Sequence, residues 1–260
     1  MALEFPNIDP IFLKIGFLQF SWYGLSYAVG ILISSWYCKY LVKKYNLKIS
    51  ISQLDSFICF LIIGIVFGGR LGYVCIYDAQ RYFANPMDIL KTYEGGMSFH
   101  GGLLGVLIAT LMFCYFYKVS FWLLIDLVAA SSPIAIFLGR IANFINGELY
   151  GRVTNFALGV KFPPSFLPRH PSQIYESLTE GLLSFCIIYY LITRHNFINK
   201  RGFIAASFAI LYSIFRICCE FFRQPDIQIG FIANYFTAGQ LLCLPLLISG
   251  IITLWLLKQK

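Results

Sequence analysis

The feature that most constrains the fold of this chain is a succession of long apolar segments. About 20 apolar residues suffice to cross the ~30 Å hydrocarbon core of a bilayer as an α-helix. Seven such segments lie near residues 17–38, 54–75, 98–117, 121–145, 173–193, 202–222 and 236–257. Because lipid offers no hydrogen bonds to the backbone, these segments are expected to be helical. The sequence therefore predicts an all-α integral membrane protein, a bundle of seven transmembrane helices.

The composition agrees with a membrane protein and excludes other classes. Hydrophobic residues make up 58% of the chain and charged residues 12%, whereas soluble domains carry about 25% charged residues. The net charge of +8 does not indicate nucleic-acid binding, because no basic stripe on a soluble module is present. No Pro-, Gly- or Ser-rich linker divides the chain, so residues 1–260 are expected to form a single domain.

The basic residues between the segments predict an orientation. Cytoplasmic connections are enriched in lysine and arginine. One side carries Lys39, Lys43, Lys44, Lys48, Lys118, Arg194, Lys200, Arg201, Lys258 and Lys260, and the other carries Lys14, Arg81, Lys91, Arg152, Lys161, Arg169 and Arg223. Ten against seven places the N-terminus outside, on the periplasmic side, and the C-terminus in the cytoplasm.

With this orientation, unusual polar residues gather toward the outer ends of the predicted helices. An arginine near the centre of a membrane helix costs roughly 2.5 to 3.5 kcal/mol, so it calls for a function or a partner. Arg216, Glu220 and Arg223 share one helical face. The full set is Tyr23, Arg70, His100, Arg140, Asn143, Gln173, Tyr175, Glu176, Arg216, Glu220 and Arg223. We expect a polar pocket in the outer half of the bilayer.

The chemistry of this pocket favours an anion. Arg140, Arg216 and Arg223 against Glu220 alone leave surplus positive charge, and guanidinium groups bind phosphate or carboxylate through paired hydrogen bonds. Two structural alternatives remain. One is that Arg216 and Glu220 simply neutralise each other as a buried ion pair. The other is that Asn143 only forms a hydrogen bond between neighbouring helices.

Glycines and one histidine mark a second region. Gly64, Gly68 and Gly72, and the pair Gly101 and Gly105, have the spacing of close helix packing. His100 precedes that pair and is either a hydrogen-bonded interfacial residue or a general base. The eight cysteines form no Cys-x-x-Cys pair, so neither a disulfide framework nor a zinc site is expected.

At these residues the chain closely resembles the prolipoprotein diacylglyceryl transferase family. The signature Gly-Arg-x-x-Asn-Phe-x-Asn-x-Glu-x-x-Gly is filled from Gly139 to Gly151. Other family elements occur at His100 to Gly102, His170 to Glu176 and Arg216 to Arg223. The similarity runs in order from about Tyr23 to Gln240.

The resemblance implies an enzyme of the bacterial cytoplasmic (inner) membrane, multi-pass, with its active site facing the outer leaflet. It implies transfer of a diacylglyceryl group from phosphatidylglycerol to the lipobox cysteine of a preprolipoprotein, giving a thioether and glycerol phosphate. No metal or organic cofactor is expected, and the partners are phosphatidylglycerol, lipobox peptides and the lipid bilayer.

The implied reaction gives each conspicuous residue an expected role. Arg140 and Arg216 stabilise the departing phosphate, and His100 is the first candidate for the base, with Glu148 and Glu220 as alternatives. The residues expected to bind or orient the substrate are Tyr23, Arg140, Asn143, Asn146, Gly151 and Arg223. A seven-helix transporter of an anionic solute is the competing interpretation, although transporter sites usually lie near the midplane between internal repeats.

Overall fold

The computed structural model describes residues 2–6, 8–16, 18–76, 79–91, 96–163, 167–225, 230–232 and 235–259. They form two compact units, unit 1 with Met1–Cys38 and Ile125–Lys260, and unit 2 with Lys39–Leu124. Lys260, counted above for the orientation, lies outside the described residues, as does the side chain of Arg81. That the chain is a single domain stays a prediction.

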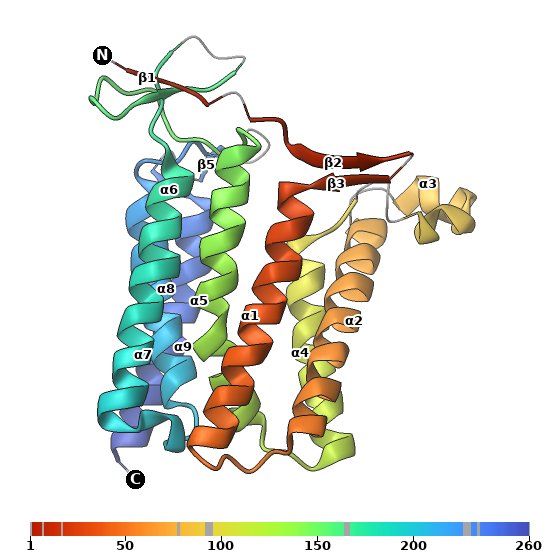
Figure 1. Cartoon of the computed structure of the whole chain (residues 1–260), viewed down its shortest axis with the longest axis vertical. Coiled ribbons are helices and arrows are strands. Elements are labelled where there is room, and N and C mark those ends of the chain that lie inside the picture. Colours follow the sequence, from red (N-terminus) through yellow and green to blue (C-terminus); the bar gives the residue numbers. More distant parts are fainter. Residues whose placement is uncertain are drawn as a thin grey trace. The chain divides into compact units, whose positions relative to one another are not determined.

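Unit 1 consists mainly of helices that run side by side, with short strands at the end where α5 finishes (Figure 1). Strands β1 and β4 pair in parallel, whereas β2 with β3 and β5 with β6 form antiparallel pairs. Its elements are β1 (Leu3–Glu4), β2 (Ile11–Ile15), β3 (Leu18–Ser21), α1 (Trp22–Lys44), α5 (Phe121–Ile145), β4 (Val160–Lys161), α6 (Ser172–Glu176), the π-helical segment η3 (Ser177–Leu183), α7 (Ser184–His195), η4 (Phe197–Asn199), α8 (Phe203–Glu220), β5 (Phe231–Ile232), β6 (Phe236–Thr237) and α9 (Ala238–Lys258). The first part of α1 and most of α5 belong to this unit.

A buried carboxylate fixes the start of α8 against α5. Asp126 of α5 has no exposed surface. Its two oxygens accept hydrogen bonds from the backbone N–H groups of Gly202, at 2.6 Å, and Ala205, at 2.8 Å. These N–H groups have no partner within the helix, and a negative charge there is favoured by the helix dipole. Asp126 therefore caps α8 from a different helix.

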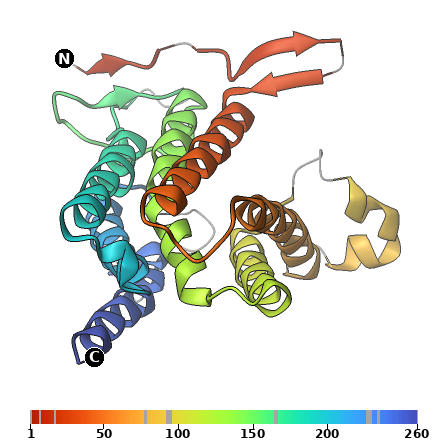
Figure 2. The ribbon, with the colours of Figure 1, turned by 60° about the horizontal axis from the view of Figure 1, so that its bottom comes forward.

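Unit 2 is built around a close pair of helices, which Figure 2 shows side by side. Its elements are α2 (Ile51–Ile76), α3 (Ala79–Ala84), the 3-10 helix η1 (Pro86–Leu90) and α4 (Phe99–Tyr117). A Cβ atom on Gly64 would lie 2.6 Å from the carbonyl oxygen of Gly105, and one on Gly72 would lie 2.7 Å from Cα of Gly101. The predicted glycine packing is thus confirmed as the contact between α2 and α4.

Arg70 of α2 has a structural task in unit 2. Its side chain is buried and donates to the carbonyl oxygens of Asp88 (2.7 Å), Ile89 (2.8 Å), Gly96 (3.1 Å) and Lys91 (3.2 Å). The described part of the segment after α2 is therefore held by one guanidinium group. These carbonyl groups use donors of Arg70, and that Arg70 also lines the expected polar pocket stays a prediction.

The helices agree with an integral membrane protein. Five helices in the described part of the chain are long and apolar enough to cross a membrane, namely α1, α2, α5, α8 and α9. The apolar part of α4 (Gly101–Tyr117) is shorter, and the helix over residues 172–195 is interrupted by η3. The seven-helix count and the orientation of the termini stay predictions.

Replacing Asp126 by alanine is expected to lower the free energy of unfolding by about 1 to 2 kcal/mol, because α8 loses its cap. The measurement is the thermal unfolding midpoint in detergent. Asp55→Ala is the matched control, since Asp55 pairs with Lys39 while its side chain is 50% exposed, and such surface pairs contribute about 0 to 1 kcal/mol. Equal midpoints for Asp126→Ala and the control would contradict the capping role.

Arg70→Met is expected to expose residues 86–91 to faster amide hydrogen exchange, because backbone carbonyl groups of this segment lose the donor that holds them to α2, at about 0.5 to 1.5 kcal/mol each. Mass-spectrometric exchange of peptides covering this segment measures the effect. Lys118→Met, which removes an exposed cation of the same unit, should leave the exchange unchanged. Unchanged protection in Arg70→Met would show that the guanidinium group does not hold the segment.

Candidate active site

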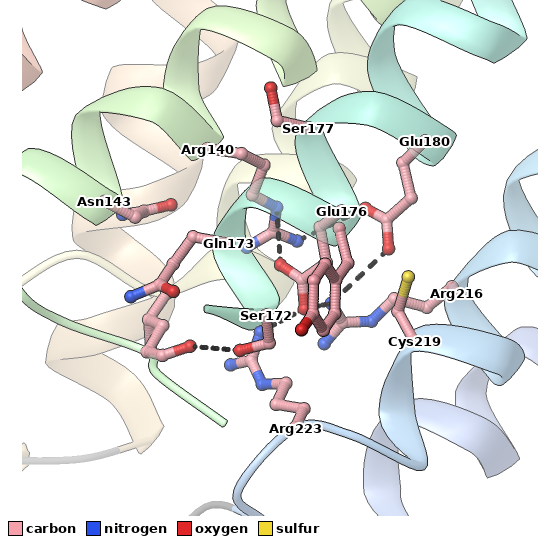
Figure 3. A network of polar contacts seen from close by, with 12 residues as sticks. Arg140, Asn143, Ser172, Gln173, Glu176, Ser177, Glu180, Arg216, Cys219 and Arg223 are labelled. Carbon is pink, nitrogen blue, oxygen red and sulfur yellow. Dashed lines mark hydrogen bonds and ion pairs between the residues drawn. The ribbon is translucent and has the colours of Figure 1, made fainter. Parts of the chain in front are cut away.

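A buried carboxylate, Glu176, lies between three arginine side chains of unit 1 (Figure 3). Its Oε2 is 2.9 Å from Nε of Arg140. Its Oε1 is 2.7 Å from Nη1 of Arg216 and 3.3 Å from Nη1 of Arg223. Arg140 of α5 and Arg216 of α8 thus point toward each other and share one counter-ion from α6.

Glu180 and Glu220 complete the charge balance. The Oε2 of Glu180 is 3.5 Å from Nη2 of Arg140, and its Oε1 is 3.6 Å from Nη1 of Arg216. The Oε1 of Glu220 is 2.5 Å from Nη2 of Arg216 and 3.8 Å from Nε of Arg223. Three carboxylates therefore face three guanidinium groups. The expectation of surplus positive charge was wrong, because two of these carboxylates come from another helix that packs on the same arginines.

The helix that carries Glu176 and Glu180 changes from α6 to the π-helical segment η3 between them. π-Helical segments are rare in proteins overall, but those that occur are often found at functional sites. A Cβ atom on Gly181 would lie 2.7 Å from Cα of Phe137, and Oγ of Ser177 donates to the carbonyl of Phe137 at 3.1 Å. This close approach of η3 to α5 brings both glutamates within reach of Arg140.

The loop after α5 forms a second polar group around Glu148. Asn143 and Asn146 donate from Nδ2 to Oε1 of Glu148 at 2.8 and 3.2 Å. Nε2 of Gln173 donates to the backbone carbonyl of Glu148 at 2.5 Å, which joins this loop to α6. Glu148 itself is exposed. Its carboxylate is therefore oriented by two amides and stays accessible.

Gly151 lies where two backbone segments cross. Its N–H donates to the carbonyl of His170 at 2.8 Å, and it forms a β-bridge with Arg223. A Cβ atom on Gly151 would lie 2.5 Å from the carbonyl oxygen of Phe222 and 2.6 Å from that of His170. Only glycine fits this crossing, so Gly151 helps to hold the chain that carries Arg223.

His170 lies in the loop before α6, as the sequence indicated. Its Nδ1 is 3.2 Å from the hydroxyl oxygen of Tyr175, and its ring contacts Phe222 at a centroid distance of 5.2 Å. Burial lowers the pKa of the His170 imidazole, which favours the neutral ring at physiological pH. The contacts of His170 are those of a packed loop residue.

The structure describes the side chain of Tyr23 but not that of His100. Tyr23 is the second residue of α1, its hydroxyl lies 3.0 Å from that of Tyr27, and it is within electrostatic range of Glu148 and Arg140. His100 is the second residue of α4 in unit 2, and its side chain lies outside the described residues. Tyr23 thus belongs to the surroundings of the arginines, and the role of His100 stays a prediction.

Sequence reasoning gave Glu176 no specific role and missed Glu180. Both are fully buried in an apolar helical stretch. Two glutamates four residues apart face the same side of a helix, and buried acids in a membrane segment require a partner. That spacing was the available signal for a carboxylate pair opposite Arg140 and Arg216.

Comparison with known proteins gives concordant results. The family model described as Prolipoprotein diacylglyceryl transferase matches residues 10–256. A Rickettsia felis protein named phosphatidylglycerol--prolipoprotein diacylglyceryl transferase is 54% identical over 249 residues, which cover 95% of this chain and 96% of the relative. A Rickettsia typhi protein of the same name is 51% identical over 256 residues, with 98% and 99% covered. The resemblance predicted from the motifs is confirmed, and the chain belongs to the prolipoprotein diacylglyceryl transferase family.

Proposed function

We propose that this chain transfers the diacylglyceryl group of phosphatidylglycerol to the cysteine thiol of a prolipoprotein lipobox. The products are a thioether-linked lipid and glycerol phosphate. Membership of the family over residues 10–256 supports this function, as do the names of relatives that are 51% and 54% identical. These names favour an enzyme over a transporter of an anionic solute.

The observation that carries the proposal is the meeting of Arg140 and Arg216 on one buried carboxylate. The side chains of Arg140 and Arg216 are 18% and 11% exposed, against 0% for Glu176. The two arginine side chains are thus held by a carboxylate that is more deeply buried than they are. Cations fixed in this way stabilise the charge that develops on a leaving phosphate without reorganising.

The nucleophile is the thiol of the lipobox cysteine, which must lose its proton to react well. A bond forms from sulfur to the lipid carbon, the carbon–oxygen bond to phosphate breaks, and the thiol proton passes to a base. Glu220 is paired with Arg216, which disfavours it as that base. His100 remains our first candidate and the accessible Glu148 the second.

Other residues are assigned to positioning. Asn143, Asn146 and Tyr23 orient the head group by hydrogen bonds, and the short contact of Glu220 with Arg216 suits a positioning role. Arg223 supports Arg216 through the shared Glu176. Gly151 contributes by permitting the backbone crossing near Arg223.

We further propose that the chain crosses the bacterial inner membrane seven times, with its N-terminus outside. Lysines and arginines favour this direction. Arg140 lies five residues before the end of α5 at Ile145, about 7.5 Å along the helix axis. The arginines would then lie in the outer half of the bilayer, within reach of lipid head groups of that leaflet.

Arg140→Lys and Arg216→Lys keep the charge that compensates the glutamates but lose the guanidinium fork. Each is expected to lower diacylglyceryl transfer by a factor of about 100 or more. The assay uses reconstituted protein, phosphatidylglycerol and a lipobox peptide, with thermal unfolding as a check of folding. Arg194→Lys, an exposed arginine at the end of α7, should transfer normally. Near-normal turnover in either active-site variant would remove the phosphate-binding role.

His100→Gln is expected to lower transfer by a factor of about 100 or more. The loss should be partly reversed above about pH 8.5, where the peptide thiol ionises unaided. The pH–rate profile of the variant against wild type measures this. His195→Gln, at an exposed position, is the control and should keep the wild-type pH–rate profile. An unchanged profile in His100→Gln would show that His100 is not the base and would favour Glu148.

A further inference from the structure

The two glutamates that face Arg140 and Arg216 hold them with different strength. Glu176 contacts the two guanidinium groups at 2.9 and 2.7 Å. Glu180 contacts the same two groups at 3.5 and 3.6 Å. One buried oxygen of each glutamate, Oε2 of Glu176 and Oε1 of Glu180, has no hydrogen-bond partner among the described residues, so the distances distinguish the two side chains. Because charge-assisted hydrogen bonds are usually 2.7 to 2.9 Å long, Glu180 is the weaker partner.

The charge balance of the site creates a difficulty for a lipid phosphate. With all groups ionised, the guanidinium groups of Arg140, Arg216 and Arg223 are matched by the carboxylates of Glu176, Glu180 and Glu220, which are all at most 4% exposed. Arg152 lies at the rim of this cluster and donates to the backbone carbonyl groups of Arg223 and Glu220. A phosphodiester brings one further negative charge. Breaking its bond to the diacylglyceryl carbon leaves a phosphomonoester with two. An uncompensated charge is costly in a buried site, so one carboxylate must give way.

We propose that Glu180 is the exchangeable counter-ion of Arg140 and Arg216. When the lipid binds, its phosphate replaces the Glu180 carboxylate at the two guanidinium groups, and the carboxylate returns to them when glycerol phosphate leaves. Glu176 stays bound throughout and keeps the two guanidinium groups aligned. Glu180 is thus a positioning residue that sets affinity for substrate and product. This inference rests on the proposed transferase function.

The displaced carboxylate takes up one proton from solvent, because it is fully buried and would otherwise carry an unpaired charge. Binding of the lipid phosphate is therefore coupled to proton uptake. The ionisable groups that face Glu180 are Arg140 of α5, Arg216, Tyr212 and Cys219 of α8, Cys243 of α9, and Glu176 of its own helix.

Glu180→Gln tests the exchange, because it keeps the shape of the side chain and removes the competing charge. In nanodiscs of neutral lipid, we expect this variant to bind phosphatidylglycerol at least about fivefold more tightly than wild type. We also expect a lower kcat and stronger inhibition by glycerol phosphate, because nothing displaces the product. A loss of stability alone would not tighten binding.

Glu176→Gln is the matched control, since it removes the same charge from the same helix. It should bind the lipid more weakly, because the two guanidinium groups lose their alignment. No tightening in Glu180→Gln, or equal tightening in Glu180→Gln and Glu176→Gln, would overturn the proposal.

Calorimetry of phosphatidylglycerol binding in two buffers with different ionisation enthalpies measures the proton uptake. Wild type should take up one proton and Glu180→Gln none, and absence of uptake in wild type would contradict the exchange. Transfer to a lipobox peptide by wild type is measured in parallel. Failure of that transfer refutes the proposed function, whereas normal transfer without the Glu180 effects refutes only the exchange.

Discussion

The site depends on one interaction, the contact of the Glu176 carboxylate with Arg140, Arg216 and Arg223. None of these charges is stable alone at such depth, and removing one partner of a buried ion pair typically costs about 3 to 5 kcal/mol. The carboxylate therefore joins α5, α6 and α8 at the place where their polar residues meet. Chemistry and folding use the same contacts here, so variants that keep the charge are more informative than deletions.

Two contacts connect α5 with α8, one near the start of both helices and one near their ends. Asp126, near the start of α5, caps the start of α8, and Glu176 links Arg140 and Arg216 near the ends of the two helices. The helices must therefore run in the same direction. A pair fixed at both ends keeps the two guanidinium groups at a constant separation, which is the preorganisation that transition-state stabilisation requires.

Much of this arrangement was predictable, because apolar length, motif spacing and helical periodicity are local properties. The helix face with Arg216 and Glu220 and the glycine contacts of α2 and α4 follow from spacing alone. The placement of Arg223 on that face was wrong, because α8 ends at Glu220 and Arg223 forms a β-bridge with Gly151. The role of Arg70 and the charge balance at Arg140 were missed, because both depend on which segments meet in space. Glu180 was not predicted because it belongs to none of the family motifs, and the π-helical segment that contains it has no recognisable pattern in the sequence.

The most direct test of the account is a structure of the wild-type protein in a nanodisc with phosphatidylglycerol bound. The account predicts lipid phosphate oxygens within about 2.7 to 3.2 Å of guanidinium nitrogens of both Arg140 and Arg216, with Glu176 in place and Glu180 withdrawn. A head group bound elsewhere, with the two arginines still held only by their glutamates, would contradict it.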